Sequence, residues 1–246
     1  MIDSKVEVGH PDLRGQVASS RDFVAGRPIG AESHGTGIAG VIAARSGNGL
    51  GMVGIAPGAR LMALRACFER PRGNDSASTC DSLTLAKALH FALEGGADVI
   101  NMSLSGPADP LLATLIELGL DRKIAVVAAF DPRRPGGGFP ASVPGVIAVA
   151  EESLPSLPPR VYRAPGRDVP TTQPGGRWYL VNGSSFAAAH ISGLLALLRE
   201  ERGSAGPSAI ARSASGTVDA CETLVGTSRN CDCSCSIART LAERRD

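Results

Sequence analysis

The sequence has no excess of charge of either sign and no long apolar run. It carries 25 basic and 24 acidic side chains among 246 residues, which gives a formal net charge of +1. This balance provides no general electrostatic attraction to nucleic acid or to an anionic membrane. A membrane-spanning helix needs about 20 consecutive apolar residues, and the best candidate, residues 191–198, is much shorter. We therefore expect a soluble protein with neither a nucleic-acid nor a membrane partner.

The beginning of the chain also lacks the marks of an export signal. Met1 is followed by Asp3 and Lys5, where a signal peptide would have a basic stretch and then an apolar core. Two hypotheses follow. Either the protein is not exported, or its true N-terminus precedes Met1 and the protein is extracellular. The sequence leaves the compartment open.

The apolar content favours one globular domain with short appendages. Apolar residues make up 43% of the chain and charged residues 20%. Such a chain can bury enough surface to offset the entropy lost on ordering, which argues against disorder. After residue 202 the sequence becomes polar and rich in cysteine. We therefore predict a folded domain over residues 1–202 and a tail over residues 203–246.

Apolar runs of strand length alternate with segments of helical periodicity. This alternation predicts an α/β fold with a mostly parallel central sheet flanked by helices. The strand candidates are continuously apolar, as strands buried on both faces should be. Strands are predicted at residues 60–66, 97–104, 124–130 and 146–150, helices at 35–44, 82–94, 111–120 and 185–199, and surface loops at 69–79 and 131–138.

The six cysteines are unevenly distributed. Cys67 and Cys80 flank a polar segment and could close it as a disulfide in an oxidising compartment. The one-residue gaps near the C-terminus do not match the two-to-four-residue gaps of ordinary zinc motifs. We therefore predict disulfides or free thiols, and no metal site, at Cys221, Cys231, Cys233 and Cys235.

Three short segments contain the residue types of nucleophilic catalysis. Asp3 lies in MIDS, His34 in HGTGIAG and Ser185 in NGSSFAAAHISG. Taken alone, His34 is more simply a capping or core histidine and Ser185 a helix N-cap. Ser185, however, follows a glycine-led turn into a long apolar helix. The unpaired N–H groups at such a helix start favour negative charge on a substrate carbonyl oxygen.

These segments occur in the order acid, histidine, serine, and the connecting segments GIAPGA, ADVINMSL and FPAS lie between them. In this respect the chain resembles the subtilisin-like serine proteases, the subtilases, over about residues 1–200. The resemblance implies a three-layer subtilisin-like fold. It also implies a serine endopeptidase with a peptide or protein substrate. We expect a monomer that requires no cofactor. Many family members bind calcium, but we identify no cluster of oxygen ligands for it here.

The resemblance assigns a role to each of the three residues. Ser185 would be the nucleophile, His34 the general base, and Asp3 the carboxylate that orients the imidazole. The backbone N–H of Ser185 would be one oxyanion donor. The segment containing Ser103, Leu104 and Ser105 would form a wall of the substrate cleft, the less favoured alternative being a plain strand end. Gly136 and Gly137 would line the specificity pocket or form a flexible loop.

The chain departs from the family at the second oxyanion donor, which in subtilases is an asparagine amide. Here the sequence reads VVAAFDP, which places Pro132 or, with a one-residue gap, Asp131 at that position. An ionised carboxylate only accepts hydrogen bonds, whereas a protonated one can donate. Losing one oxyanion donor costs about 10² to 10³ in turnover. The alternative hypotheses are a pseudoprotease that binds peptides without cleaving them and, more distantly, an esterase.

A second departure is at the N-terminus. In subtilases the catalytic aspartate ends a central strand, and only Met1 and Ile2 precede Asp3 here. The first strand is therefore expected to be clipped, in a chain that is either truncated or naturally minimal, and no inhibitory pro-segment is visible. Terminal residues are poorly ordered unless they are tied down. Asp3 is accordingly the weakest of the three assignments.

Overall fold

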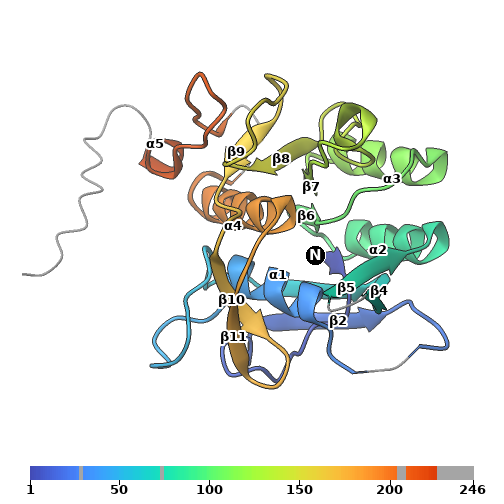
Figure 1. Cartoon of the computed structure of the whole chain (residues 1–246), viewed down its shortest axis with the longest axis vertical. Coiled ribbons are helices and arrows are strands. Elements are labelled where there is room, and N and C mark those ends of the chain that lie inside the picture. The colour runs from blue at the N-terminus through green and yellow to red at the C-terminus, as the bar shows by residue number, and fades with distance from the viewer. Residues whose placement is uncertain (28–29, 73–74, 204–208, 226–246) are drawn as a thin grey trace, which may run out of the picture.

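Two parallel sheets, flanked by helices, form the body of the protein (Figure 1). The structure, a computed structural model, describes residues 1–27, 30–72, 75–203 and 209–225. One sheet has the order β1-β3-β2 and the other the order β6-β7-β8-β9, and all neighbouring strands in both are parallel. The strands are β1 (Ile2–Asp3), β2 (Val17–Asp22), β3 (Leu61–Arg65), β6 (Val99–Met102), β7 (Ala125–Ala129), β8 (Ile147–Glu151) and β9 (Tyr162–Ala164). The predicted α/β class is confirmed.

Helices cover both faces of the sheets, and the side chains of β7 show how. Val126 and Ala128 belong to the core that also contains Leu89 of α2 and Ile116 of α3. The alternate residue Val127 belongs to a second core together with apolar residues of α4. Because successive side chains of a strand point to opposite faces, a strand covered on both sides needs apolar residues throughout. The helices are α1 (Ser33–Ala43), α2 (Ser82–Glu94), α3 (Pro110–Asp121), α4 (Ser184–Arg202) and α5 (Ala220–Val225).

The segment 69–79, predicted as a loop, is instead part of a β-hairpin. Strands β4 (Cys67–Arg72) and β5 (Asp75–Cys80) pair antiparallel, with Cys67 opposite Cys80. The two sulfurs form a disulfide of 2.06 Å. The prediction was wrong because it treated polarity as evidence against a strand, whereas an antiparallel hairpin takes its order from its own backbone pairing and from the covalent link. The disulfide that the sequence allowed between Cys67 and Cys80 is therefore present.

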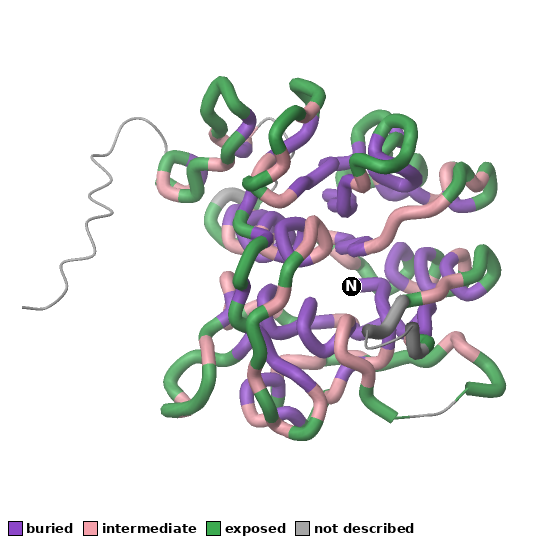
Figure 2. Tube along the Cα trace, viewed as in Figure 1, coloured by how far each residue is buried: buried purple, intermediate pink, exposed green. Residues whose placement is uncertain are grey.

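A second hairpin, formed by β10 (Val169–Gln173) and β11 (Arg177–Val181), was also not predicted. Part of the expected tail folds onto the domain. Ile210 is buried with Tyr162 in the core beneath α4, and Arg163 pairs with Thr217. Figure 2 shows that buried chain is concentrated in the sheets and in the helix faces against them. The cysteines at 231, 233 and 235 lie outside the described residues, while Cys221 is in a disulfide.

The described part of the chain has no grouping of three or more histidine, cysteine, aspartate or glutamate side chains suited to a metal ion. In the same ranges, no helix has the length and apolarity needed to cross a membrane.

Candidate active site

The carboxylate of Asp3 is buried and lies in hydrogen-bond contact with the imidazole of His34. Asp3 ends β1 and is 3% exposed, and its Oδ1 lies 2.7 Å from His34 Nδ1. The same oxygen accepts the backbone N–H of Ser4 at 2.7 Å. Parallel pairing of β1 with β3 holds Asp3 opposite Arg65. A buried carboxylate at this distance fixes the ring orientation and places a proton on Nδ1, which leaves Nε2 as the basic nitrogen.

Glycine after His34 allows the start of α1 to approach the end of β1. A Cβ at Gly35 would lie only 2.3 Å from the backbone carbonyl oxygen of Ser4. The Gly35 backbone N–H donates to Ser4 Oγ at 2.9 Å. Because a carbonyl oxygen cannot move aside as a side chain can, this position excludes any larger residue. The pair His34-Gly35 is therefore required by packing as well as by chemistry.

The charges around His34 favour its protonated form. Burial opposes protonation, but the Asp3 carboxylate and, to a lesser degree, Glu69 outweigh that effect. The pKa of His34 is therefore raised above its ordinary value of 6.5. A stabilised imidazolium is what a general base needs after it accepts a proton.

Ser185 lies in the first turn of α4, and its side chain is linked to the end of β6. Its Oγ donates to the Ser103 carbonyl oxygen at 3.2 Å, and Ser103 Oγ donates to the Ser185 carbonyl oxygen at 2.8 Å. Behind this pair, Asn101 Nδ2 donates to Ser103 Oγ, and Ser192 Oγ donates to Asn101 Oδ1. This buried chain of polar groups joins strand and helix and positions the serine.

One open cleft of about 1540 Å³ brings the three candidate residues together. Asp3, His34 and Ser185 all line it. Ser103, Leu104 and Ser105 line it as well, next to Gly106, whose backbone forms an isolated antiparallel bridge with Phe139. The segment predicted to form a cleft wall thus borders the same cleft as Ser185.

Gly136 and Gly137 are not among the residues that line this cleft, contrary to the expectation from the sequence. They form a short 3₁₀ turn over Pro135–Gly137. Gly137 packs against the ring of Phe130, where a Cβ would lie 2.2 Å from ring carbon Cδ2. The Gly136 carbonyl accepts a hydrogen bond from Arg160. The small size of Gly137 lets the ring of Phe130, which lines the cleft, sit close to the turn.

Asp131 lines the cleft with an ionised carboxylate. Arg133 Nε donates to Asp131 Oδ1 at 2.9 Å, and Arg133 Nη2 donates to Asp131 Oδ2 at 3.2 Å. Arg134 Nε lies 3.6 Å from Asp131 Oδ2. The hydrogen bond from Arg133 outweighs desolvation and lowers the pKa of Asp131. A carboxylate in this state accepts hydrogen bonds and donates none. Sequence reasoning identified the missing amide but not the pairing with Arg133 and Arg134, which lie two and three residues after Asp131 in the chain.

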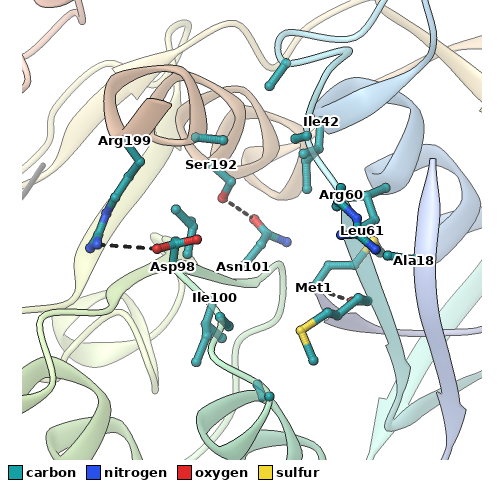
Figure 3. A pocket seen from close by; sticks show the side chains of 18 of the residues that line it. Met1, Ala18, Ile42, Arg60, Leu61, Asp98, Ile100, Asn101, Ser192 and Arg199 are labelled. Atoms are coloured by element: carbon teal, nitrogen blue, oxygen red, sulfur yellow. Dashed lines mark hydrogen bonds and ion pairs between the residues drawn. The ribbon is translucent and has the colours of Figure 1, made fainter. Parts of the chain in front are cut away.

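A second cavity, of about 810 Å³, lies away from this cleft and is shown in Figure 3. Arg199 Nη1 lies 3.8 Å from Asp98 Oδ1 at its margin. Asn101 and Ser192 face it while they also support Ser103. This cavity contains none of the three catalytic candidates.

Comparisons with known proteins show the family of the chain. The sequence model of the Subtilase family, Peptidase_S8, matches residues 1–220. The chain is 35% identical over 215 residues to a thermophilic serine proteinase of Bacillus sp. strain AK1, covering 82% of this chain and 51% of the relative. It is 33% identical to subtilisin E of Bacillus subtilis strain 168, covering 80% and 54%. The chain thus spans about half the length of these curated relatives.

Solved structures show the same fold. The prenylagaramide maturation protease PagA superposes with a TM-score of 0.70 at 24% identity, covering 91% of this chain and 90% of that one. A mutant of the protease domain of PatA gives 0.72 at 25% identity, covering 90% and 92%. The fold is therefore the α/β fold of the subtilisin-like class. The chain belongs to the subtilase family.

Proposed function

We propose that the chain hydrolyses peptide bonds through an acyl-enzyme formed on Ser185. The observation that carries this proposal is the 2.7 Å contact between Asp3 Oδ1 and His34 Nδ1 in a cleft that Ser185 also lines. A serine hydroxyl is a poor nucleophile near neutral pH and needs an adjacent, oriented base. The family assignment supports a peptide as the substrate.

Each residue has a defined part in the proposed reaction. The Ser185 hydroxyl turns from the Ser103 carbonyl toward His34, and Nε2 takes its proton as Oγ attacks the scissile carbonyl carbon. The same imidazole then protonates the leaving amine, and a water molecule hydrolyses the acyl-enzyme by the reverse sequence. Asp3 stabilises the imidazolium throughout. The reaction needs no cofactor.

The first turn of α4 supplies one donor for the oxyanion. The first N–H groups of a helix have no partner within it, and Ser185 occupies the second position of α4. Its N–H, together with the positive end of the helix dipole, stabilises charge on the carbonyl oxygen. At the family's second donor position the carboxylate of Asp131 cannot donate. We therefore expect turnover reduced by about 10² to 10³ relative to a site with two donors.

A fluorophosphonate probe tests the proposal, because such a probe labels only an activated serine. Wild type should be labelled, and Ser185→Ala and His34→Ala should not. Ser184→Ala is the matched control, because it removes a neighbouring hydroxyl of the same helix turn. Labelling that persists in Ser185→Ala, or is absent in a folded wild type, would contradict the proposal.

One pair of observations favours a second function, peptide binding without turnover. The Ser185 hydroxyl donates to the Ser103 carbonyl oxygen, and Asp131 brings a negative charge to the oxyanion side. In that case wild type would bind a cleft-spanning peptide in a calorimetric titration but leave both the probe and the peptide unchanged.

A further inference from the structure

Glu69, on the disulfide-closed hairpin, reaches the first turn of α1 from outside the three-residue site. Its Oε1 accepts the backbone N–H of His34 at 2.5 Å and the hydroxyl of Ser4 at 3.3 Å. Ser4 in turn accepts from Gly35 N–H and donates its own N–H to Asp3. One carboxylate oxygen thus joins the segment that holds Asp3 to the helix that holds His34.

A buried ion-pair network anchors Glu69 in this place. Glu32 Oε1 accepts the backbone N–H of Glu69 at 2.9 Å, and Glu32 Oε2 accepts that of Lys5 at 2.6 Å. Arg65, whose side chain is 2% exposed, donates to both Glu32 oxygens at 3.2 Å and to Asp22 at 3.0 Å. Bidentate arginine–carboxylate pairs add geometric specificity as well as energy. The network therefore ties β3, β4 and the start of α1 together.

The hairpin keeps Glu69 near the helix through its own covalent closure. Glu69 lies two residues from Cys67 and pairs with Ser78 in the hairpin register. The disulfide between Cys67 and Cys80 fixes the base of the hairpin, next to β3. A two-stranded hairpin alone is marginally stable, so the covalent link limits how far Glu69 can move away.

We propose that Glu69 is a positioning residue for catalysis, which holds the His34 backbone in register with Asp3 and adds a second negative charge beside the imidazole, and that the Cys67–Cys80 disulfide keeps it there. The expected change in catalytic rate rests on the proposed function. The expected effect on the His34 imidazole rests on the structure alone.

The charges that face His34 support this role. Asp3 and Glu69 both raise the pKa of His34 against the effect of burial. From α4 the facing group is the uncharged ring of Phe186, with centroids 5.7 Å apart. Two other charged groups next to the start of α1 and the end of β1 have partners of opposite charge: Glu32 pairs with Arg65, and Lys5 pairs with Asp22.

Glu69→Gln separates charge from geometry, because the amide oxygen can still accept both hydrogen bonds. Its first readout is the pKa of the His34 ring from an NMR titration, with His34→Ala used to assign the signal. We expect the pKa to fall relative to wild type, because the negative charge of Glu69 is one of the causes that raise it. Glu94→Gln is the matched control, because Glu94 is exposed and pairs with Arg122, and it should leave the pKa unchanged. An unchanged His34 pKa in a folded Glu69→Gln variant overturns the proposal, whether or not the chain is an enzyme.

The kinetic readout is the pH profile. Glu69→Gln should move the acid limb of kcat/KM to lower pH, in step with the pKa change of the free protein, because a less basic imidazole stays neutral in more acidic solution. Glu69→Ala removes the hydrogen bonds as well, and should lower kcat about tenfold with KM changed less than twofold. A fall in thermal stability with an unshifted acid limb and unchanged kcat would indicate a merely structural role and overturn the proposal.

The double variant Cys67→Ser/Cys80→Ser tests the part played by the disulfide. Compared with wild type at a temperature where both are folded, it should shift the His34 pKa in the same direction as Glu69→Gln. Combined with Glu69→Gln it should add little further shift, because both changes act through the same carboxylate. Independent, fully additive shifts would contradict the proposed link. If the double variant does not fold, the titration of Glu69→Gln decides the matter.

Discussion

The carboxylates on the two sides of the cleft have different partners. On the side of β1 and α1, the carboxylates of Asp3 and Glu69 are directed at an imidazole and at backbone N–H groups. On the other side, the carboxylate of Asp131 lines the cleft and is paired with Arg133 and Arg134. Negative charge stabilises an imidazolium, whereas it opposes a developing oxyanion. Under the proposed function, the first side would carry proton transfer, and the second would offer the oxyanion one donor fewer than the family's pattern.

The largest effect should come from the proton-transfer side. His34→Ala removes the base and should lower kcat/KM by about 10⁴ or more, because the nucleophile and its base act as one unit. Phe186→Leu is a suitable control, since it changes a ring that packs beside His34 without removing a proton acceptor. A fall in kcat/KM smaller than about tenfold would show that His34 is not the catalytic base. The proposed difference between the two sides of the cleft would then not hold.

The second prediction concerns the close packing of the start of α1 against the end of β1, which brings His34 next to Asp3. Gly35→Ala should destabilise the fold by about 3 kcal/mol, because its Cβ would meet the Ser4 carbonyl oxygen. Gly9→Ala is the control, because nothing lies within 4 Å of the Cβ built there. Urea unfolding measures both variants. Equal stability of the two variants would mean that the two segments are not packed as described.

A third substitution acts on the opposite side. Asp131→Asn replaces the carboxylate with an amide that can donate, and should raise kcat by an order of magnitude or more. Steady-state hydrolysis of a peptide substrate measures the change. Arg133→Gln is the control for disturbing the ion pair alone, and should not raise kcat. An unchanged or lower rate in Asp131→Asn would show that this carboxylate does not face the oxyanion.

The smallest effect is a displacement of the pH profile. Because the pKa of His34 is raised, the acid limb of kcat/KM in the free enzyme should lie above pH 6.5, the ordinary histidine value. Activity should rise as pH rises through this limb, because only the neutral imidazole accepts a proton. A profile from pH 5 to pH 9 at constant ionic strength tests this. A limb below the ordinary histidine value would contradict the charge arrangement around His34.

Periodicity predicted helices α1 to α4 and the parallel strands β3, β6, β7 and β8, whose side chains pack into the apolar cores, but it did not predict the parallel strands β2 and β9. Helix α2 begins at Ser82 and ends at Glu94, as the sequence indicated. Asp81 caps it by accepting the Thr84 N–H at 2.9 Å, and two glycines follow its last residue. Such signals are local, and nothing elsewhere in the chain is needed to interpret them.

The hairpin of β4 and β5 was not predicted for the opposite reason. The strands β4 and β5 are polar, and their order comes from pairing with each other, from the disulfide and from contacts of Glu69 with Glu32 and His34. Polar composition in a hairpin resembles that of a loop, since no apolar face distinguishes the two. The ion pair between Arg133 and Asp131 was likewise not predicted. It depends on a backbone turn in which the N–H and Nε of Arg133 both donate to Asp131 Oδ1.

The sequence by itself determined the family, the alternation of strands and helices, and the residue types of the candidate triad, because these reside in short motifs and in local periodicity. Only the tertiary structure decided which groups surround that triad. The Asp3–His34 contact spans 31 residues, the Glu69–His34 contact 35, and the Ser185–Ser103 contact 82. Contacts between distant segments depend on strand register and on how closely backbones pack, and neither property is encoded in any one stretch of the chain.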